Sequence, residues 1–292
     1  MEFRQLEYFI AVAEEANFTR AADRVHISQS GVSAQVRQLE HELGASLIDR
    51  SGRTATLTPA GAAALGPARA VLASVAAVRA AVDAVTGLVR GRLTVGMITG
   101  CTVTPLFDAL AAFHRAHPGI EITLFEDTSD QLIARVRAGT ADLALVGVAG
   151  EVPPGLSGFP VVTERLVAAV PPGHELHGRT GVTLDEVSGH PIVCLPEGTG
   201  IRGVFDQACA AAGVRPGVAL QAGAPGAVAD LAIRGLGVAI LSESMVAGYG
   251  GRLAAVLIDD VRTPAVLALI WTATDGPAVR EFLGHARRAF AR

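Results

Sequence analysis

The sequence predicts an α/β protein in three parts: an N-terminal winged helix-turn-helix domain, a long linker helix, and a two-lobed α/β domain like that of periplasmic binding proteins. Short helical patterns separated by a tight turn occupy the first part, and a long helix with a repeating apolar stripe follows. From residue 92 onward, strand-like and helix-like segments alternate. We expect the three parts at 1–58, 59–88 and 89–292, with lobe I at about 92–161 and 266–292 and lobe II at about 162–265.

The first domain combines three helices with a small wing. The opening helix places Leu6, Phe9, Ile10 and Ala13 on one face. A second helix follows Thr19 as its expected N-cap and buries Ala21, Ala22 and Val25. After a break at His26 and Ile27, Ser28 caps a third helix with Val32, Val36 and Leu39 facing inward. Leu43, Leu47 and Ile48 should continue the core, and "DRSGRTATLT" predicts two short strands around Ser51 and Gly52.

The linker helix begins with Thr58 as N-cap and Pro59 at the first helical position, and it should run to Val85. Its apolar stripe comprises Ala64, Ala68, Val71, Val75, Val78, Val82 and Val85, at spacings of four and three. Because such a stripe must be buried, a second copy of the helix is the simplest partner. We therefore expect a homodimer.

The remaining segments should form parallel sheets covered by helices on both faces. Expected strands lie at 92–98, 120–126, 142–147, 165–171, 191–195, 218–221, 237–241, 254–258 and 264–272. Expected helices lie at 103–117, 129–138, 183–186, 201–213, 225–235, 244–248 and 277–290. Crossings near 161–164 and 262–265 are the expected hinges between the lobes.

Composition excludes several classes of protein. Half of the residues are hydrophobic, yet no run reaches the roughly eighteen apolar residues that a membrane helix needs, and the first residues do not resemble an export signal. We expect a cytoplasmic protein without membrane contact. The net charge of −4 argues against a nucleic-acid coat protein. The three cysteines, Cys101, Cys194 and Cys209, are expected to be buried thiols, with a redox pair of Cys194 and Cys209 as the alternative.

The third helix carries an unusual polar face. With its apolar residues inward, Gln29, Ser30, Ser33, Ala34 and Arg37 should point outward. No acidic residue occurs from Ser28 to Leu39, whereas an ordinary solvated face usually mixes both charges. Glutamine, serine and arginine match base edges in the major groove, and a helix N-terminus favours phosphate. The pattern therefore favours DNA binding.

The stretch "AADRVHISQSGVSAQVRQLEHELGASLIDRSGRTATLTPAG" resembles the N-terminal signature of LysR-type transcriptional regulators, and the plan downstream is similar to their effector-binding domain. The resemblance implies a dimer through linker helices, usually paired into a homotetramer. It further implies binding to double-stranded promoter DNA and a response to a small molecule, with RNA polymerase as a further candidate partner.

The resemblance also assigns residues. Gln29, Ser30, Ser33 and Arg37 would line the major groove; Thr19, Arg20, Ser28 and Gln35 would bind phosphates; Arg50 and Arg53 of the wing would reach the backbone or minor groove. Two positions depart from the family pattern. Ala34 removes a contact that arginine often makes, and Gly31 costs the helix about 1 kcal/mol relative to alanine.

Three loops are candidates for an effector site between the lobes, because two-lobed α/β domains bind ligands at strand ends and helix starts. They supply Thr99, Gly100, Cys101 and Thr102; Thr128 and Ser129; and Glu197, Gly198, Thr199 and Arg202. Hydroxyls and amides there suit an organic anion or an amino acid-like metabolite. For each single loop, ordinary helix capping is the alternative. Glu197 would repel a carboxylate, which favours an amino group or polyol unless Arg202 offsets it; an oxidant-sensing role for Cys101 is a further alternative.

An enzyme would need a catalytic constellation. The sequence has no nucleophile elbow, P-loop, dinucleotide fingerprint or metal-ligand spacing, so we expect no enzyme, no metal and no cofactor. A solute-binding protein with a non-DNA interaction module is the competing hypothesis for residues 92–292. It would not need residues 1–58.

Overall fold

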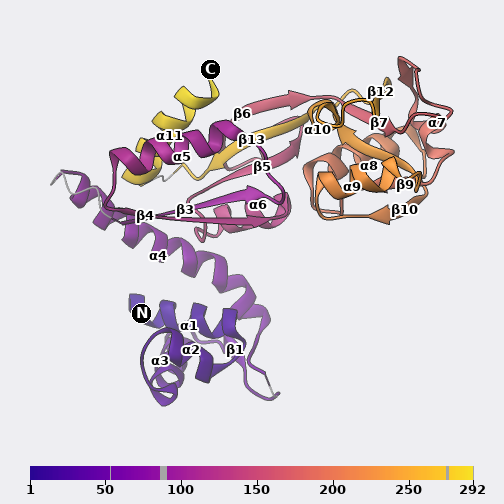
Figure 1. Ribbon diagram of the computed structural model, residues 1–292. Coiled ribbons are helices and arrows are strands. Elements are labelled where there is room, and N and C mark those ends of the chain that lie inside the picture. The colour runs from indigo at the N-terminus through magenta and orange to yellow at the C-terminus, as the bar shows by residue number, and fades with distance from the viewer. Residues whose placement is uncertain (53, 86–90, 274–275, 292) are drawn as a thin grey trace. The chain divides into compact units, whose positions relative to one another are not determined.

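The computed structural model describes residues 1–52, 54–85, 91–273 and 276–291. The chain forms two compact units, Met1–Leu88 and a second unit that holds Val89–Arg137 and Ala141–Arg292 (Figure 1). Within the described ranges, no helix is both long and apolar enough to cross a membrane.

The first unit is a winged helix-turn-helix followed by a long helix. It contains α1 (Phe3–Glu15), α2 (Phe18–Arg24), α3 (Gln29–Leu43), β1 (Ile48–Asp49), β2 (Thr56–Leu57) and α4 (Pro59–Val85). The two strands pair antiparallel as the wing. A single core joins the three short helices to the wing and α4, with Phe9, Ala21, Val36 and Leu39 fully buried.

Two details of this unit correct the sequence prediction. The N-cap of α2 is Asn17, whose side chain accepts hydrogen bonds from the amides of Thr19 and Arg20 at 2.8 and 3.1 Å. Thr19 therefore lies inside the helix, and the predicted cap is wrong by two residues; asparagine is at least as good an N-cap as threonine. Leu43 is 47% exposed rather than part of the core, because α3 ends there at Gly44, whose left-handed φ of 69° turns the chain away.

Helix α4 begins as predicted, and only the first part of its apolar stripe packs against the core of its own unit. Thr58 accepts a hydrogen bond from the amide of Gly61 at 3.0 Å. Ala64, Ala68 and Val71 pack against the core of their own unit. Val75 is half-buried and Val78 is 66% exposed, whereas Val82 and Val85 lie outside the described side chains. The N-terminal half of the stripe thus packs within its own unit. Only the C-terminal half can pack against a second copy of the helix.

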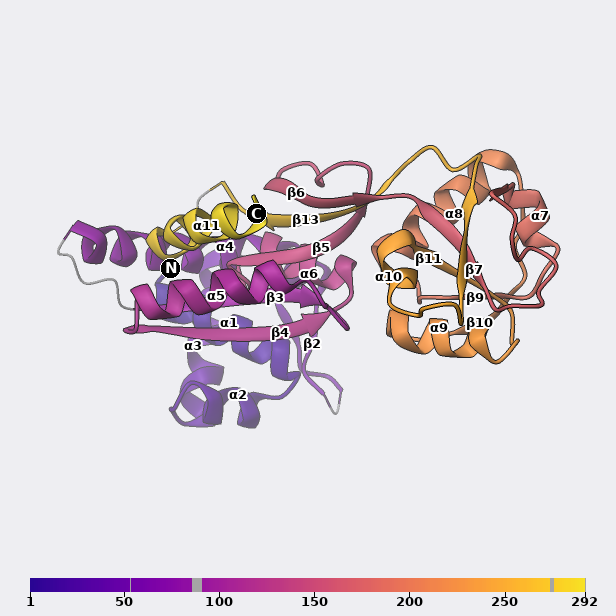
Figure 2. The same ribbon diagram turned by 45° about the horizontal axis from the view of Figure 1, so that its top comes forward.

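Lobe I of the second unit is a five-stranded sheet in the order β4-β3-β5-β13-β6. Its strands are β3 (Gly91–Ile98), β4 (Ile120–Asp127), β5 (Leu143–Ala149), β6 (Ser157–Glu164) and β13 (Ala265–Trp271). Helices α5 (Thr104–Ala116) and α11 (Pro277–Phe290) cover one face, and α6 (Ser129–Arg137) covers the other (Figure 2). Alternate residues of each strand face the two layers, so that Leu145 meets α5 and α11 while Val146 meets α6.

Lobe II is a six-stranded sheet in the order β10-β9-β11-β7-β12-β8. The strands are β7 (Leu166–Val170), β8 (Gly181–Val182), β9 (Ile192–Cys194), β10 (Val218–Gln221), β11 (Val238–Ser242) and β12 (Ala254–Ile258). The helices are α7 (Leu184–Ser188), α8 (Gly200–Ala212), α9 (Pro225–Ile233) and α10 (Glu243–Ala247). The continuous burial of β7 and β11 shows that they form the centre of the lobe.

The predicted α/β fold is confirmed, but both sheets are mixed rather than parallel. Strand β13 runs antiparallel to β5 and β6, and β7 runs antiparallel to β11 and β12. A chain that leaves one lobe and later returns brings its returning strand back in the opposite direction. Strands β6 and β8 were not predicted, and residues 161–164 lie inside β6 rather than in a hinge.

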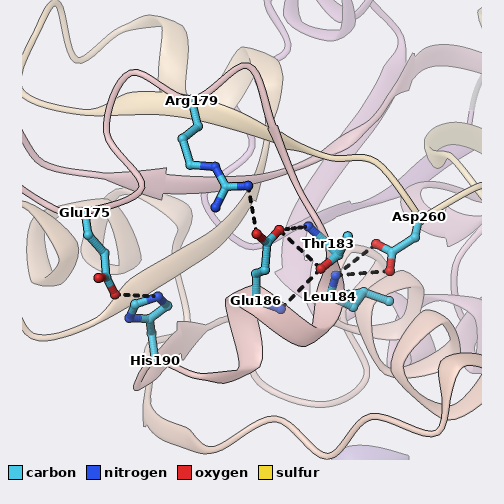
Figure 3. A network of polar contacts seen from close by, with 7 residues as sticks. All are labelled: Glu175, Arg179, Thr183, Leu184, Glu186, His190 and Asp260. Carbon is cyan, nitrogen blue, oxygen red and sulfur yellow. Dashed lines mark hydrogen bonds and ion pairs between the residues drawn. The ribbon is translucent and has the colours of Figure 1, made fainter.

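Two segments cross between the lobes. The first is the single residue Arg165, between β6 and β7, and the second is residues 259–264, between β12 and β13. Figure 3 shows how the second is fastened: both carboxylate oxygens of Asp260 accept hydrogen bonds from the amide of Leu184, at 2.9 and 3.1 Å. In the same network, Thr183 and Glu186 form a capping box at the start of α7. The beginning of this crossing is therefore part of lobe II.

Candidate nucleic-acid interface and interlobe site

The start of α3 is an exposed surface without acidic residues. Ser28, Gln29, Ser30 and Arg37 are exposed, and so is Ala34. Ser28 Oγ accepts a hydrogen bond from the amide of Gly31 and lies 3.1 Å from Ser30 Oγ. Arg37 makes no ion pair within the described part of the chain. The guanidinium and amide groups of this surface are thus available to a partner.

Two of the predicted contacts on α3 are less accessible. Ser33 is buried, with 9% of its surface exposed, and this corrects its predicted outward position. It immediately follows Val32 and lies one turn before Val36, both fully buried, so it belongs to the edge of the apolar face. Gln35 is half-buried.

Arginines of α2 are tied to the end of α1. Thr19 and Arg20 are exposed as predicted. The Arg20 guanidinium donates to the backbone oxygen of Glu15, and its Nε lies 3.4 Å from the Glu15 carboxylate. Arg24 pairs with Glu14 at 2.7 Å, and Glu14 also binds Arg69 of α4 at 2.6 Å. Burial raises the pKa of Glu14, but its hydrogen bonds with Arg69 and Arg24 outweigh this and hold the pKa below its ordinary value.

The wing differs more from the prediction. Arg50 is held inside the unit: its Nη2 lies 2.8 Å from a carboxylate oxygen of Glu40, and its guanidinium stacks over the ring of Phe18 at 5.2 Å. The structure therefore gives Arg50 a bracing position. Arg53 lies outside the described residues.

Glu40 was missed by sequence reasoning. Its side chain is only 11% exposed, and one carboxylate oxygen accepts hydrogen bonds from the amides of Leu47 and Ile48 at 2.8 and 3.0 Å. The other oxygen binds Arg50. A glutamate near the end of a helix is ordinarily a solvated residue, and only the fold shows that the chain returns to it. Glu40 joins α3 to the first strand of the wing.

In the second unit, the first predicted loop faces the start of α9. Gly100 has a left-handed φ of 71°, and its amide donates to Glu126 at 3.2 Å. A side chain at position 100 would begin 3.5 Å from Ala224 Cβ and from Pro225 Cδ. Sequence reasoning missed the segment around Ala224, although a proline at the start of a helix could have marked it. Thr99 and Thr102 are exposed, and Cys101 is half-buried.

The second and third loops touch each other. The amide of Asp130 donates to the carbonyl of Gly198 at 3.1 Å, which joins the two lobes. Ser129 does not face open space as predicted: it is 2% exposed, and its Oγ accepts a hydrogen bond from the amide of Gly147. Thr128 is half-buried. The half-buried Thr199 donates its hydroxyl to the carbonyl of Pro196 at 2.8 Å.

Arg202 also departs from its predicted role. It is 7% exposed, and its Nε lies 2.8 Å from both carboxylate oxygens of Asp206. Its Nη1 donates to Cys194 Sγ and to the carbonyl of Leu195. The guanidinium lies 3.7 Å from Glu197, whose side chain is 84% exposed. Arg202 therefore braces the start of α8 and has little free capacity for an anion.

Two of the three thiols, Cys194 and Cys209, are buried, and Cys101 is half-buried. Burial raises the pKa of the half-buried Cys101, and the carboxylate of Glu126 raises it further. Burial also raises the pKa of Cys194 against the opposing charge of Arg202. Burial, with the carboxylates of Asp206 and Asp260, raises the pKa of Cys209 to about 11. Among the described residues, no group of three or more potential metal ligands comes together.

Two family models match the chain. Residues 3–62 match the family described as bacterial regulatory helix-turn-helix proteins, lysR family. Residues 86–291 match the family described as the LysR substrate binding domain. The matched ranges correspond to the winged helix-turn-helix with the start of α4, and to the two lobes.

Relatives and solved structures agree. A probable hydrogen peroxide-inducible genes activator of Mycobacterium avium is 35% identical over 242 residues, 82% of this chain and 78% of that protein. The transcriptional regulator ShiR of Corynebacterium glutamicum is 35% identical over 246 residues, 83% of each chain. Among solved structures, full-length OxyR of Pseudomonas aeruginosa shares the fold at 23% identity, with a TM-score of 0.73 over 99% of this chain and 94% of that one. CbnR in complex with its target DNA is 27% identical, with a TM-score of 0.59 over 99% and 100%.

Replacing Glu40 by glutamine should loosen the wing. The glutamine oxygen can still accept the amides of Leu47 and Ile48, but its NH2 group faces the Arg50 guanidinium with a donor and without the charge, so we expect the free energy of unfolding to fall by about 1–3 kcal/mol in chemical denaturation. Glu7→Gln, at an exposed position of α1, is the control and should have no effect. Equal stability of the two variants would contradict the bracing role of Glu40.

Proposed function

The chain belongs to the LysR family of bacterial DNA-binding transcriptional regulators, and from this premise we propose that the exposed start of α3 reads promoter DNA. The supporting observation is the acid-free surface from Ser28 to Arg37, in which the guanidinium of Arg37 has no described ion-pair partner. A planar guanidinium group can bind guanine with two hydrogen bonds. Gln29 and Ser30 would contact neighbouring bases.

The remaining contacts take supporting roles in this proposal. Thr19, Ser28 and Gln35 would bind phosphates. Arg20 would do so only with the part of its guanidinium that Glu15 leaves available. Arg50 would brace the wing rather than enter a groove, because Glu40 and Phe18 already hold it. The buried Ser33 would support the reading surface from beneath.

We propose the domain limits 1–58, 59–88 and 89–292, and a homodimer joined by the free half of α4. The exposed Val78 and half-buried Val75 continue an apolar stripe that the unit's own core leaves uncovered. Two such dimers would form a homotetramer on promoter DNA in the cytoplasm, where RNA polymerase can reach it.

We propose that the effector is a small molecule with an amino group or several hydroxyls, bound where the β3–α5 loop approaches the start of α9. Glu126 and Glu197 contribute negative charge on the two lobes, and Asp206 already neutralises Arg202. Thr99 and Thr102 offer exposed hydroxyls. These features weaken the expectation of an organic anion.

We further propose that the signal is ligand binding rather than thiol oxidation, although some relatives are named for hydrogen peroxide. Thiols react with peroxide as thiolates, and burial raises the pKa of each cysteine in this chain. No enzymatic step is part of the proposal.

Arg37→Ala tests the reading surface. The operator is first obtained by sequencing genomic fragments that the purified wild-type protein retains. The variant should lose about 1–3 kcal/mol of its preference for this operator over a scrambled duplex, measured by fluorescence anisotropy at fixed salt. Arg4→Ala removes the same charge from the exposed start of α1 and should keep the preference. An unchanged preference in Arg37→Ala would refute the placement of α3, and retention of no duplex would refute DNA reading altogether.

A thermal-shift screen tests the effector class. Ligands that bind the folded state raise the melting temperature, so amines and polyols should raise it while simple carboxylates should not. Glu197→Gln should reduce the shift produced by an amine, whereas Asp185→Asn, at an exposed position of α7, should leave it unchanged. A carboxylate that stabilises the protein, and does so more strongly in Glu197→Gln, would overturn this proposal.

Thiol titration tests the insensitivity to peroxide. With a pKa of about 11, Cys209 carries a thiolate fraction of about 0.1% or less at pH 7.5. Because the pKa is raised, the reaction of this thiol should become faster only at alkaline pH. In the native protein we expect slow reaction of Cys101 alone, and reaction of all three thiols after unfolding. Peroxide should leave this total unchanged. Loss of two thiols, with Cys194 and Cys209 joined, would restore the redox alternative.

A further inference from the structure

One of the contacts between the two lobes is made by backbone alone. Gly147, near the end of β5 in lobe I, lies against Gly200, the first residue of α8 in lobe II. A Cβ atom added to Gly200 would lie 2.5 Å from Gly147 Cα and 2.6 Å from Gly147 O. Real Cβ atoms do not approach backbone this closely, and backbone cannot rotate away as a side chain can. The contact therefore admits no side chain at position 200.

Neighbouring hydrogen bonds hold this contact in place. The amide of Gly147 donates to Ser129 Oγ at 3.0 Å, which fixes Gly147 to the start of α6. The amide of Asp130, the next residue, donates across to the carbonyl of Gly198 in lobe II at 3.1 Å. Ser129 is 2% exposed, so water does not compete for its bond. The starts of α6 and α8 and the end of β5 thus form one junction.

The junction lies beside the second crossing between the lobes. The amide of Gly150, three residues after Gly147, donates to the carbonyl of Pro264 at 3.0 Å. Asp260 fastens the beginning of the same crossing to α7. Val261 packs against the core of lobe II, so residues 262–264 are the part of this crossing that separates the junction from lobe II.

We propose that Gly147 and Gly200 are positioning residues that set the angle between the lobes, and that a side chain at position 200 forces a different angle. Reaching an ordinary van der Waals distance of 3.4 Å from the present 2.5 Å requires a displacement of about 1 Å at the junction. Because the junction lies next to the crossing, the displacement becomes a rotation of one lobe against the other. This inference rests on the proposed effector function, since the angle sets the approach of the β3–α5 loop to α9.

The test compares Gly200→Ala with Gly203→Ala in the full chain. Both lie on α8, and a Cβ at Gly203 would meet nothing within 4 Å. Hydrogen exchange with mass spectrometry follows the Asp130 amide, which reports the bond between the lobes. We expect exchange there to be about tenfold faster in Gly200→Ala, with protection of β11 unchanged; Gly203→Ala should match the wild type in both places. A merely structural effect on lobe II would lower the protection of β11 as well.

The milder variant Gly147→Ala covers the case in which Gly200→Ala does not fold. Its Cβ would lie 3.1 Å from Gly200 Cα, so we expect a smaller acceleration at Asp130. Wild-type exchange at Asp130 in every folded variant would overturn the proposal, as would acceleration confined to the first turn of α8. A second arm footprints the operator: Gly200→Ala should shift the protected boundaries, and Gly203→Ala should not. If the wild type protects no DNA, the proposed function fails, while the exchange result still decides the junction.

Discussion

The first unit depends on how the far end of α3 is held by the Glu40 carboxylate. One oxygen fixes the two residues that begin the wing, and the other fixes Arg50, which in turn lies over Phe18 of α2. With its apolar face buried and its end braced, α3 can leave its first turns exposed. Ser28 caps the helix by accepting a hydrogen bond from the amide of Gly31, whereas the exposed side chains of Gln29 and Arg37 make no polar contact within the described part of the chain.

Local signals in the sequence predicted most elements, because helix caps and apolar periodicity act over a few residues. Ser28 and Thr58 begin helices as expected, and α4 begins at Pro59 and is helical throughout its described length. Sheet direction depends instead on which distant strands become neighbours. For that reason the antiparallel return of β13 was not predicted, nor was β6, whose residues include Gly158 and Pro160.

The candidate sites were predicted less completely, since a polar residue can serve either a ligand or the protein itself. The exposed residues of α3 lie where the sequence placed them. Ser129 and Arg202 were predicted as ligand contacts, but Gly147 and Asp206 occupy their polar atoms. Glu40 had no local signal at all. The pairing of Arg202 with Asp206, one turn later on the same helix, was open to sequence reasoning, whereas only the fold brings Gly147 to Ser129 and the wing to Glu40.

The unequal crossings between the lobes restrict how this regulator can move. The first crossing is the single residue Arg165, and the strands on both sides of it are paired in their own sheets. It therefore keeps the lobes at a constant separation. The second crossing is longer, and it is held at its two ends: Val261 packs on lobe II, and the carbonyl of Pro264 accepts a hydrogen bond from the amide of Gly150. Such a linkage permits twisting about Arg165 but no simple pulling apart. Binding of a metabolite would therefore rotate one lobe relative to the other. Neighbouring subunits that contact different lobes would be reoriented by that rotation.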